Sequence, residues 1–422
     1  MVGTVMEYGC IGEKLTHSFS KEIHNLLFSY EYNLLELPRN KVGAFLEKRD
    51  FKAINVTIPY KETVIPHLDF VSDTAKKIGA VNTIVNKDGK LYGYNTDYLG
   101  MKALLDYEGI DLCGKKVLIL GSGGTCKTAY TLSCDLGARE VLRVSRKETG
   151  DLISYETAIN KHSDAEVIIN TTPCGMYPNI DTTAISLEPF ENLCAVVDAV
   201  YNPLRSRIVR EAVKRGIKAT GGLYMLVAQA AIAAEKFVKE NVPTEKIGKI
   251  YKQILFSKEN VVLTGMPSCG KSTLGKMVAE MLSMDFVDTD TLIAEKAGKS
   301  IPEIFESEGE KAFRDLESAV IKEVSTLQHT VIATGGGAVL REENVEYLRQ
   351  NGKIVFIDRP LKYLITTSDR PLSRNMDLLK KRYDERYSIY KETADIRFVP
   401  IKDKECNAKK IIKEWKNEIF GN

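Results

Sequence analysis

The stretch Gly265-Met266-Pro267-Ser268-Cys269-Gly270-Lys271-Ser272 decides the fold of the C-terminal half of the chain. It matches the phosphate-binding pattern GxxxxGK[ST] at every fixed position. A β-rich run precedes it at 261–264 and a helical pattern follows at 273–282, so the loop is predicted to join a strand to a helix. Backbone amides in such a loop cradle a β-phosphate, Lys271 neutralises the β- and γ-phosphates, and Ser272 binds Mg²⁺. The segment predicts a site for ATP and Mg²⁺ that extends from Gly265 through Thr273.

Two other apolar runs also end in glycine. The run at 117–120 leads into Gly121-Ser122-Gly123-Gly124-Thr125-Cys126, and the run at 331–334 leads into Gly335-Gly336-Gly337. A strand followed by glycines and a helix turns backbone amides toward an anion. Around the first loop, a helical pattern at 125–136 and a strand pattern at 140–145 complete a βαβ unit that is typical of dinucleotide binding. Cys126 stands where the pattern has its third glycine, and its side chain is small enough for close packing.

The residues after the second strand of this unit indicate which dinucleotide binds. An NAD enzyme places Asp or Glu there to bind the ribose hydroxyls, whereas this chain has Ser145, Arg146 and Lys147. Two cations without an acid favour a 2′-phosphate. The sequence therefore predicts NADP(H) rather than NAD(H).

Length and composition limit the function classes. At about 150 residues per domain, 422 residues predict roughly three folding units of α/β class. The net charge of +2 and the absence of an apolar run near 20 residues argue against nucleic-acid binding and a membrane span. Eight scattered cysteines without a CxxC pair favour reduced thiols, so we expect a cytoplasmic protein. Its oligomeric state is left open.

Further motifs follow the phosphate-binding loop in a fixed order. They are Asp288-Thr-Asp290, Phe313-Arg314, the triple glycine, Arg370-Pro-Leu, and Arg386 with Tyr390. This set resembles shikimate kinase over residues 258–400. The resemblance implies a parallel five-stranded sheet with a lid, and it implies site residues with stated roles. Asp290 would act as base, Arg314 and Arg386 would bind the shikimate carboxylate, Gly336 and Gly337 would approach the ring, Arg370 would reach in from the lid, and Asp288 would join Ser272 at Mg²⁺.

This half departs from the kinase family in two places. The early lid stretch at 364–368 is uncharged, where the family usually has a basic residue near the nucleotide. Cys269 replaces the usual small Gly or Ser and is interpreted as a space-filler. The first departure bears on ATP affinity rather than on the identity of the acceptor.

The N-terminal half carries polar motifs suited to a polyhydroxylated ring. They are Ser18-Phe-Ser20, Asn55-Val-Thr57-Ile-Pro-Tyr-Lys61, Gly79-Ala-Val-Asn82, Gly93-Tyr-Asn95-Thr-Asp97, and later segments around Tyr201 and Gln229. In this order they resemble shikimate dehydrogenase over about residues 5–238. The histidines at 17, 24 and 67 lack the spacing of metal ligands and are interpreted as structural.

The dehydrogenase resemblance implies a role for each matching residue. Lys61 and Asp97 would be the catalytic pair, and we expect the site to desolvate Lys61. The substrate-binding residues would be Ser18, Ser20, Thr57, Asn82, Asn95, Asp97, Tyr201 and Gln229. The NADP-binding residues would be Gly121, Ser122, Gly123, Gly124, Thr125, Ser145, Arg146, Lys147, Gly222 and Met225.

Both halves point to one metabolite. We therefore predict reduction of 3-dehydroshikimate to shikimate with NADPH, followed by phosphorylation of shikimate with ATP. Two alternatives remain: a quinate-type dehydrogenase joined to a related kinase, and a nucleotide-sensing regulator built on inactive copies of both folds. The expected organisation is a substrate domain (1–100) with a returning helix (222–238), a Rossmann domain (101–221), a linker containing a helix (239–258) and a kinase domain (259–422).

Overall fold

The structure is a computed structural model that describes residues 6–15, 18–364 and 376–421. Arg370 and most of the early lid stretch lie outside these ranges, as does His17. The chain divides into two compact units, Met1–Ile254 and Leu255–Asn422. No helix within the described ranges is both long and apolar enough to cross a membrane.

The first sheet of the N-terminal unit contains six strands in the order β2-β1-β3-β5-β6-β4. Its strands are β1 (Tyr8–Gly12), β2 (Tyr32–Glu36), β3 (Ala53–Val56), β4 (Phe70–Val71), β5 (Thr83–Lys87) and β6 (Lys90–Tyr94). Strand β5 runs antiparallel to both β3 and β6. The first residues of β5 therefore lie at the same edge as the last residues of β3 and β6. The helices that accompany this sheet are α1 (Ser20–Leu27), α2 (Val42–Lys48) and α3 (Asp73–Ile78), with the short 3₁₀ segments η1 (Arg39–Lys41) and η2 (Ile65–His67).

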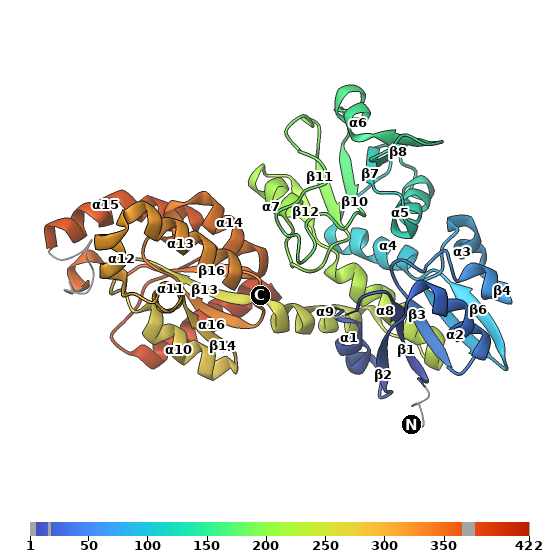
Figure 1. Cartoon of the computed structure of the whole chain (residues 1–422), viewed down its shortest axis with the longest axis horizontal. Coiled ribbons are helices and arrows are strands. Elements are labelled where there is room, and N and C mark those ends of the chain that lie inside the picture. The colour runs from blue at the N-terminus through green and yellow to red at the C-terminus, as the bar shows by residue number, and fades with distance from the viewer. Residues whose placement is uncertain (1–5, 16–17, 365–375, 422) are drawn as a thin grey trace. The chain divides into compact units, whose positions relative to one another are not determined.

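The second sheet of this unit is parallel throughout, in the order β12-β11-β10-β7-β8-β9. Its strands are β7 (Lys116–Leu120), β8 (Glu140–Ser145), β9 (Leu152–Ser154), β10 (Val167–Asn170), β11 (Ala195–Asp198) and β12 (Lys218–Thr220). Helices α4 (Asp97–Glu108), α5 (Gly124–Asp135), α6 (Tyr155–Lys161) and α7 (Arg207–Lys214) accompany it (Figure 1). Side chains of β7 alternate between the two faces of the sheet, so Val117 packs in the core on one face and Leu118 in the core on the other. Because both faces are covered, all four positions at 117–120 are apolar. This is the order of a Rossmann domain.

An alanine-rich helix, α8 (Leu223–Val238), follows the second sheet and packs against α4, α1 and β5. Its small side chains allow close approach, and it is buried over most of its length. The next helix, α9 (Thr244–Lys258), occupies the stretch expected to contain a helix within the linker. Ile247 and Tyr251 pack on a core of the first unit, while Leu255 and Phe256 pack on the core of the second.

The C-terminal unit is built on five parallel strands in the order β14-β15-β13-β16-β17, which confirms the predicted five-stranded parallel sheet. The strands are β13 (Asn260–Thr264), β14 (Asp285–Asp288), β15 (Thr330–Ala333), β16 (Gly352–Ile357) and β17 (Ile396–Phe398). Figure 1 shows α13 (Gly309–Val324) and α14 (Glu342–Asn351) on one face of the sheet and α10 (Lys271–Leu282) and α16 (Lys404–Phe420) on the other. The remaining helices are α11 (Thr289–Ala297), α12 (Ile301–Ser307) and α15 (Met376–Thr393), with the 3₁₀ segments η3 (Ala338–Leu340) and η4 (Leu361–Tyr363).

Strand β14 ends at Asp288 and helix α11 begins at the next residue, so Asp288 and Asp290 both lie at the C-terminal edge of the strand. The reason is the Asp288 side chain, which accepts hydrogen bonds from the backbone N–H groups of Asp290 and Thr291 at 3.0 and 3.4 Å. A carboxylate in this N-cap position satisfies free amides and starts the helix immediately.

Candidate active sites

The first candidate site lies at one edge of the mixed sheet. Thr57 follows β3, Asn82 precedes β5, and Asn95 follows β6. Because β5 runs against its two neighbours, these three positions come together although 38 residues separate the first from the last. Backbone bonds between them hold the edge, from Val56 N–H to Asn82 O at 2.8 Å and from Asn82 N–H to Tyr94 O at 3.0 Å.

Lys61 and Asp97 form the central pair of this site. The Lys61 Nζ lies 2.6 Å from Asp97 Oδ2, and their side chains are only 14% and 8% exposed. Asp97 is the first residue of α4, where the helix N-terminus favours a negative charge. Lys61 also donates to Thr125 Oγ1 at 3.3 Å, and Thr125 belongs to the glycine loop of the second sheet. The lysine is thereby held between a carboxylate and the loop expected to bind the cofactor.

Asn82 and Gln229 lie beside this pair in a shared hydrogen-bond network. Asn82 Nδ2 donates to Thr96 Oγ1 at 2.9 Å and to Gln229 Oε1 at 3.4 Å, and Thr96 N–H donates back to Asn82 Oδ1 at 2.7 Å. Gln229 comes from α8, the helix that packs on α4. The network fixes the amide orientations of two residues expected to bind substrate.

Ser18, Ser20 and Tyr201 form a second small group. Ser18 Oγ donates to Ser20 Oγ at 3.0 Å, and the rings of Phe19 and Tyr201 are 5.2 Å apart. Burial raises the pKa of Tyr201 to about 12, and a hydrogen bond with Ser18 opposes this shift. The Tyr201 hydroxyl therefore keeps its proton at neutral pH and can donate a hydrogen bond to an anion.

Thr57 and Asn95 differ in how much of their polar surface is available. Thr57 is partly exposed, and its methyl group faces Gly12 so closely that an added Cβ there would lie 2.7 Å away. Asn95 is 6% exposed and donates to Ala80 O at 3.0 Å and Thr128 Oγ1 at 3.3 Å, while its Oδ1 accepts from Tyr98 N–H. Asn95 thus already has partners within the chain.

The glycine loop joins β7 to α5 in the way that the sequence predicts. Gly121 has a φ of +125°, and a Cβ there would lie 2.6 Å from Thr171 Oγ1. An added Cβ at Gly124 would lie 3.3 Å from the Cβ atoms of Ala80 and Lys61, whereas Gly123 has open space beside it. The loop therefore lies close to Lys61 on one side and presents free backbone at the start of α5 on the other. This fits a dinucleotide phosphate group.

Cys126 takes the place of the third glycine without opening the fold. It is fully buried, its Sγ donates to Gly121 O at 3.0 Å, and burial raises its pKa to about 11. A buried thiol with a raised pKa is unreactive. The residue therefore serves packing, as expected from its size.

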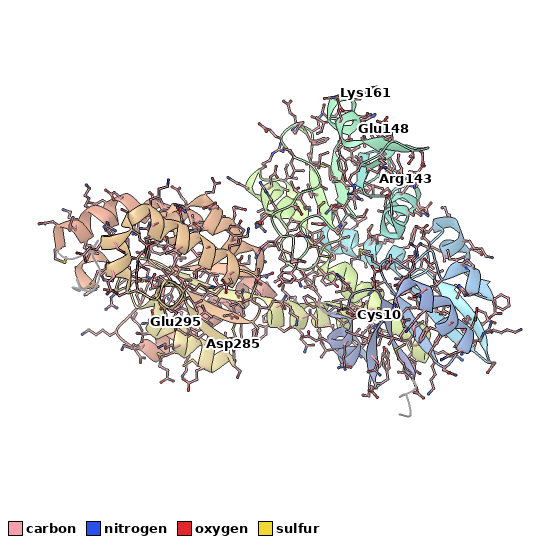
Figure 2. All side chains as sticks on the ribbon, viewed as in Figure 1. Cys10, Arg143, Glu148, Lys161, Asp285 and Glu295 are labelled. Atoms are coloured by element: carbon pink, nitrogen blue, oxygen red, sulfur yellow. The ribbon has the colours of Figure 1, made fainter. Side chains whose placement is uncertain are left out.

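The corner after β8 presents Arg146 and Lys147 to solvent. Ser145 does not project with them, because its hydroxyl turns to the backbone of Lys147 at 2.5 Å. The next acid, Glu148, which is labelled in Figure 2, lies in the same part of the chain. It accepts hydrogen bonds from Thr157 Oγ1 at 2.6 Å and Ser154 N–H at 3.1 Å, and these bonds lower its pKa. Its carboxylate is thus committed to the start of α6 and leaves two cations at the corner.

Gly222 and Met225 lie at the start of α8. Gly222 caps the helix, and a Cβ there would overlap the carbonyl of Ala199. Met225 is 6% exposed and belongs to the core beside α4. Both therefore lie where α8 passes between the second sheet and α4.

The second candidate site surrounds the phosphate-binding loop between β13 and α10. Gly265 and Gly270 have φ values of +141° and +108°, and Ser268 is also in the left-handed region at +63°. Lys271 folds back over this loop, where its Nζ donates to Gly265 O at 2.8 Å and Met266 O at 3.0 Å. Cys269 is 1% exposed, in agreement with a space-filling role.

Ser272 and Asp288 provide two oxygen atoms beside the loop. Ser272 Oγ donates to Asp288 Oδ2 at 2.6 Å, and Asp290 lines the same cavity. Within the described residues no cluster of three or more His, Cys, Asp or Glu could hold a metal. One hydroxyl and one or two carboxylates, completed by phosphate oxygens and water, fit Mg²⁺, which is rarely held by protein ligands alone.

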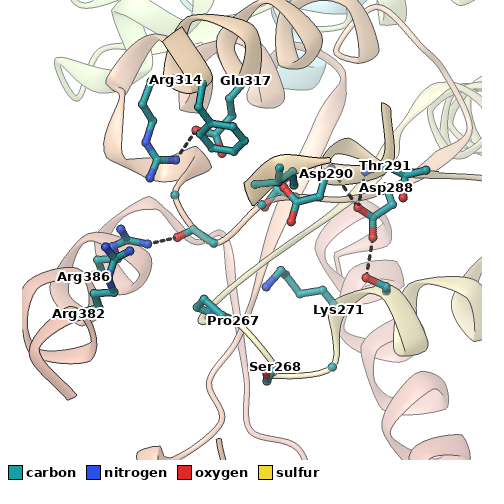
Figure 3. A pocket seen from close by; sticks show the side chains of 18 of the residues that line it. Pro267, Ser268, Lys271, Asp288, Asp290, Thr291, Arg314, Glu317, Arg382 and Arg386 are labelled. Carbon is teal, nitrogen blue, oxygen red and sulfur yellow. Dashed lines mark hydrogen bonds and ion pairs between the residues drawn. The ribbon is translucent and has the colours of Figure 1, made fainter. Parts of the chain in front are cut away.

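A cavity of about 490 Å³ connects the loop to the acceptor residues expected from the sequence (Figure 3). Arg314 and Arg386 both line it, as do the three glycines. Arg314 is paired with Glu317 at 2.7 Å and Glu310 at 3.2 Å, and Arg386 donates to Gly336 O at 2.9 Å. An added Cβ at Gly337 would overlap the Arg314 guanidinium, which explains why this position cannot carry a side chain.

Glu317 and Arg382 also line this cavity, and neither was recognised from the sequence. Burial raises the pKa of Glu317, and Arg314 opposes the shift. Its spacing of three residues from Arg314 on one helix was a signal that could have identified it. For Arg382 the corresponding signal was its spacing of four residues from Arg386. Thr125 was expected at the cofactor, and its contact with Lys61 could not be read from the sequence.

Two family models match different parts of the chain. Residues 10–84 match the shikimate dehydrogenase substrate binding domain, and residues 267–419 match shikimate kinase. The shikimate dehydrogenase (NADP(+)) of Clostridium beijerinckii is 40% identical over 243 residues, which cover 54% of this chain and 90% of that protein. Its counterpart in Clostridium perfringens is 40% identical over 266 residues, 58% of this chain and 97% of that protein.

Solved structures resemble the N-terminal unit. Shikimate dehydrogenase 1 from Peptoclostridium difficile has a TM-score of 0.55 at 35% identity and covers 59% of this chain and 97% of its own. The shikimate 5-dehydrogenase from Thermus thermophilus, in complex with NADP(H) and shikimate, has a TM-score of 0.53 at 29% identity and covers 59% of this chain and 99% of its own. A chorismate mutase/shikimate 5-dehydrogenase fusion protein from Clostridium acetobutylicum has a TM-score of 0.56 at 33% identity, again over 59% of this chain and 97% of its own.

Proposed function

Because the chain belongs to the shikimate dehydrogenase family and carries a shikimate kinase domain behind it, we propose that it catalyses two consecutive reactions. The N-terminal unit reduces 3-dehydroshikimate to shikimate with NADPH. The C-terminal unit then transfers the γ-phosphoryl group of ATP to shikimate. The observation that carries this proposal is that two independent sites in one chain fit the same small acid.

The reduction depends on Lys61 and Asp97. Bound NADPH supplies the hydride that reduces the ketone carbon. Lys61 holds the proton that the resulting oxyanion takes up, and Asp97, 2.6 Å away, keeps the Lys61 side chain oriented toward that oxygen. Ser18, Ser20, Asn82 and Gln229 bind the substrate ring so that its ketone oxygen faces Lys61. Shielding from water strengthens each of these contacts.

The choice of NADPH follows from the charges at the end of β8. Arg146 and Lys147 are exposed there, and the nearby Glu148 carboxylate is engaged by Ser154 and Thr157. An adenosine 2′-phosphate would gain two cationic partners, whereas a free ribose hydroxyl would find no carboxylate.

The phosphoryl transfer depends on positioning and charge neutralisation. Mg²⁺, held by Ser272 and Asp288 when bound, would neutralise the phosphate oxygens. Lys271 exchanges its two loop carbonyls for phosphate oxygens, and Asp290 accepts the proton of the attacking hydroxyl. Arg314 and Arg386 orient the acceptor by its carboxylate, and Arg370 is proposed to reach the transferred group from the lid.

A coupled assay tests both halves at once. Purified chain receives 3-dehydroshikimate, NADPH, ATP and Mg²⁺, and NADPH loss and ADP release are followed together. We expect NADPH loss first and ADP release after a lag set by shikimate accumulation. Absence of NADPH oxidation would reject the first assignment, and shikimate accumulating without ADP would reject the second.

Substrate comparison separates the remaining alternatives. A quinate-type dehydrogenase would show a higher kcat/KM for quinate than for shikimate in the oxidative direction. A nucleotide-sensing regulator would bind NADPH or ATP without turnover. The close Lys61–Asp97 pair beside the glycine loop supports an enzyme, since an inactive copy of the fold need not keep a proton donor at the place expected to bind the cofactor.

A further inference from the structure

Two arginines of helix α15, Arg382 and Arg386, lie on the face of the helix that lines the acceptor cavity. They are four residues apart and both line the acceptor cavity, together with Arg314 from α13 (Figure 3). Like charges at this spacing are neighbours on a helix surface and repel each other. Burial lowers the pKa of Arg382, and the charges of Arg386 and Arg314 lower it further, although arginine stays protonated at any physiological pH. An arrangement of this kind is stabilised when an anion binds.

The partners of the three arginines differ. Arg314 is engaged by two carboxylates, Glu317 and Glu310, and Arg386 donates to the carbonyl of Gly336. Arg382 forms no hydrogen bond and no ion pair with any residue in the described ranges. Its guanidinium donors are therefore available to a ligand in the cavity without breaking a contact first.

The charge balance of the cavity leads to the same residue. Four cations line it, Lys271, Arg314, Arg382 and Arg386, against the three carboxylates of Asp288, Asp290 and Glu317, which leaves one net positive charge. Without Arg382 the remaining groups would cancel, and a carboxylate entering the cavity would meet no net attraction. A planar guanidinium also pairs with a carboxylate through two parallel hydrogen bonds.

We propose that Arg382 is a specificity-determining residue of the kinase site, which binds the carboxylate of the acceptor alongside Arg386. This inference rests on the proposed function, because it assigns a role within the same acceptor site. Arg314, held by Glu317 and Glu310, contacts the same carboxylate from α13, and the guanidinium of Arg382, which has no partner among the described residues, selects for a carboxylic acid over a neutral analogue.

Steady-state kinetics of Arg382→Ala and Arg382→Lys test this role. With saturating ATP and Mg²⁺, we expect Arg382→Ala to raise the KM for shikimate at least tenfold, with kcat changed less than twofold and the KM for ATP unchanged. Arg382→Lys should give an intermediate KM, because it keeps the charge and loses the fork. Lys381→Ala, an exposed neighbour on the same helix, removes an equal charge and should match the wild type.

A neutral substrate makes the test specific. The carboxamide of shikimate lacks the negative charge, so wild type and Arg382→Ala should phosphorylate it with the same kcat/KM. An equal loss on shikimate and on the carboxamide would overturn the proposal, as would an unchanged KM for shikimate. An unchanged thermal midpoint and ATP KM exclude misfolding, and Arg382→Lys gives a second reading if the alanine variant is unstable. A wild type that releases no ADP with shikimate would refute the kinase function itself, which is a different result.

Discussion

The two candidate sites hold their lysines in opposite ways. In the first, Lys61 contacts the carboxylate of Asp97, its expected catalytic partner, and the hydroxyl of Thr125, which belongs to the loop expected to bind the cofactor. In the second, Lys271 donates to the carbonyls of its own loop, and Arg314 is paired with two glutamates. The reductase site is assembled before substrate arrives, whereas the kinase site holds Lys271 and Arg314 on internal partners.

The chemistry of each reaction accounts for this difference. Ketone reduction creates charge on one oxygen, so a single proton donor held in place is sufficient. Phosphoryl transfer brings in a polyanion, so several cations must converge on it, and they would repel one another in its absence. Bonds to the loop carbonyls keep Lys271 in position for the polyanion, while Glu310 and Glu317 hold Arg314 at the acceptor end of the cavity.

The largest expected loss of activity follows from a change in the Lys61–Asp97 pair. Lys61→Ala removes the proton donor and should lower dehydrogenase kcat about 10³-fold, while kinase activity stays at the wild-type level. Both activities are measured on the same preparation, with Lys61→Met as a variant that keeps the apolar stem. Lys76→Ala, at an exposed lysine of the same unit, is the control. Retained reductase activity in either Lys61 variant would remove its catalytic role.

Replacing the lysine of the second site, Lys271, should cause a somewhat smaller loss of activity. Lys271→Ala deletes one of several cations and should lower kinase kcat roughly 10²-fold to 10³-fold, with dehydrogenase kinetics unchanged. The loss should appear in ADP release at saturating shikimate. If Lys271→Ala and Lys61→Ala each impaired both activities, the two sites would not be independent, and the comparison would fail.

Acid should distinguish the two units by stability. His24 is fully buried, and its ring stacks on that of Tyr32 with the ring centroids 3.8 Å apart. Burial lowers the pKa of His24 from 6.5 to about 3. Below pH 6.5 the unfolded chain therefore binds a proton that the folded chain does not, so stability falls as the pH falls toward 3. At pH 4.5 the His24 contribution alone costs about 2–3 kcal/mol, and the buried Asp198 carboxyl, whose pKa burial raises to about 7, opposes it in the same unit.

His24→Gln removes this contribution, so its free energy of unfolding should rise relative to that of the wild type by about 2–3 kcal/mol between pH 7 and 4.5. Unfolding of the N-terminal unit is followed by loss of dehydrogenase activity. Trp415 is the single tryptophan of the chain and is buried in the C-terminal unit, so its fluorescence reports the other half independently. The fluorescence transition should be the same in both proteins. A difference between the two proteins that does not change with pH would contradict the role of His24.

The smallest expected effect is at the cofactor corner. Arg146 is exposed, so its contact with a 2′-phosphate is screened by water, and Arg146→Ala should raise the KM for NADPH about tenfold. The KM for NADH should stay nearly unchanged, because NADH lacks that phosphate. An equal rise for both cofactors would contradict the preference for NADPH and would place Arg146 at the shared part of the dinucleotide.

Much of this protein could be read from local sequence. The strands before the three glycine turns, the helices after two of them and the parallel order of the kinase sheet agree with the structure, because alternation of side chains and glycine turns are properties of short segments. The same holds for His24, which was interpreted as structural and is stacked in a core. The capping bond by which Asp288 starts α11 beside Asp290 is a detail of side-chain geometry that the sequence does not show.

The sequence by itself determined the fold class, the two phosphate-binding loops and the candidate lysines of both sites, since each rests on residue type and spacing within about ten positions. Only the tertiary structure decided which groups these side chains contact. Thr125 reaches Lys61 across 64 positions, and Arg314 meets the glycine turn that follows another strand. Arg382 enters a cavity formed largely by residues distant from it in the chain. Such contacts depend on how sheets and helices pack, and no periodic pattern within one segment specifies its neighbours in space.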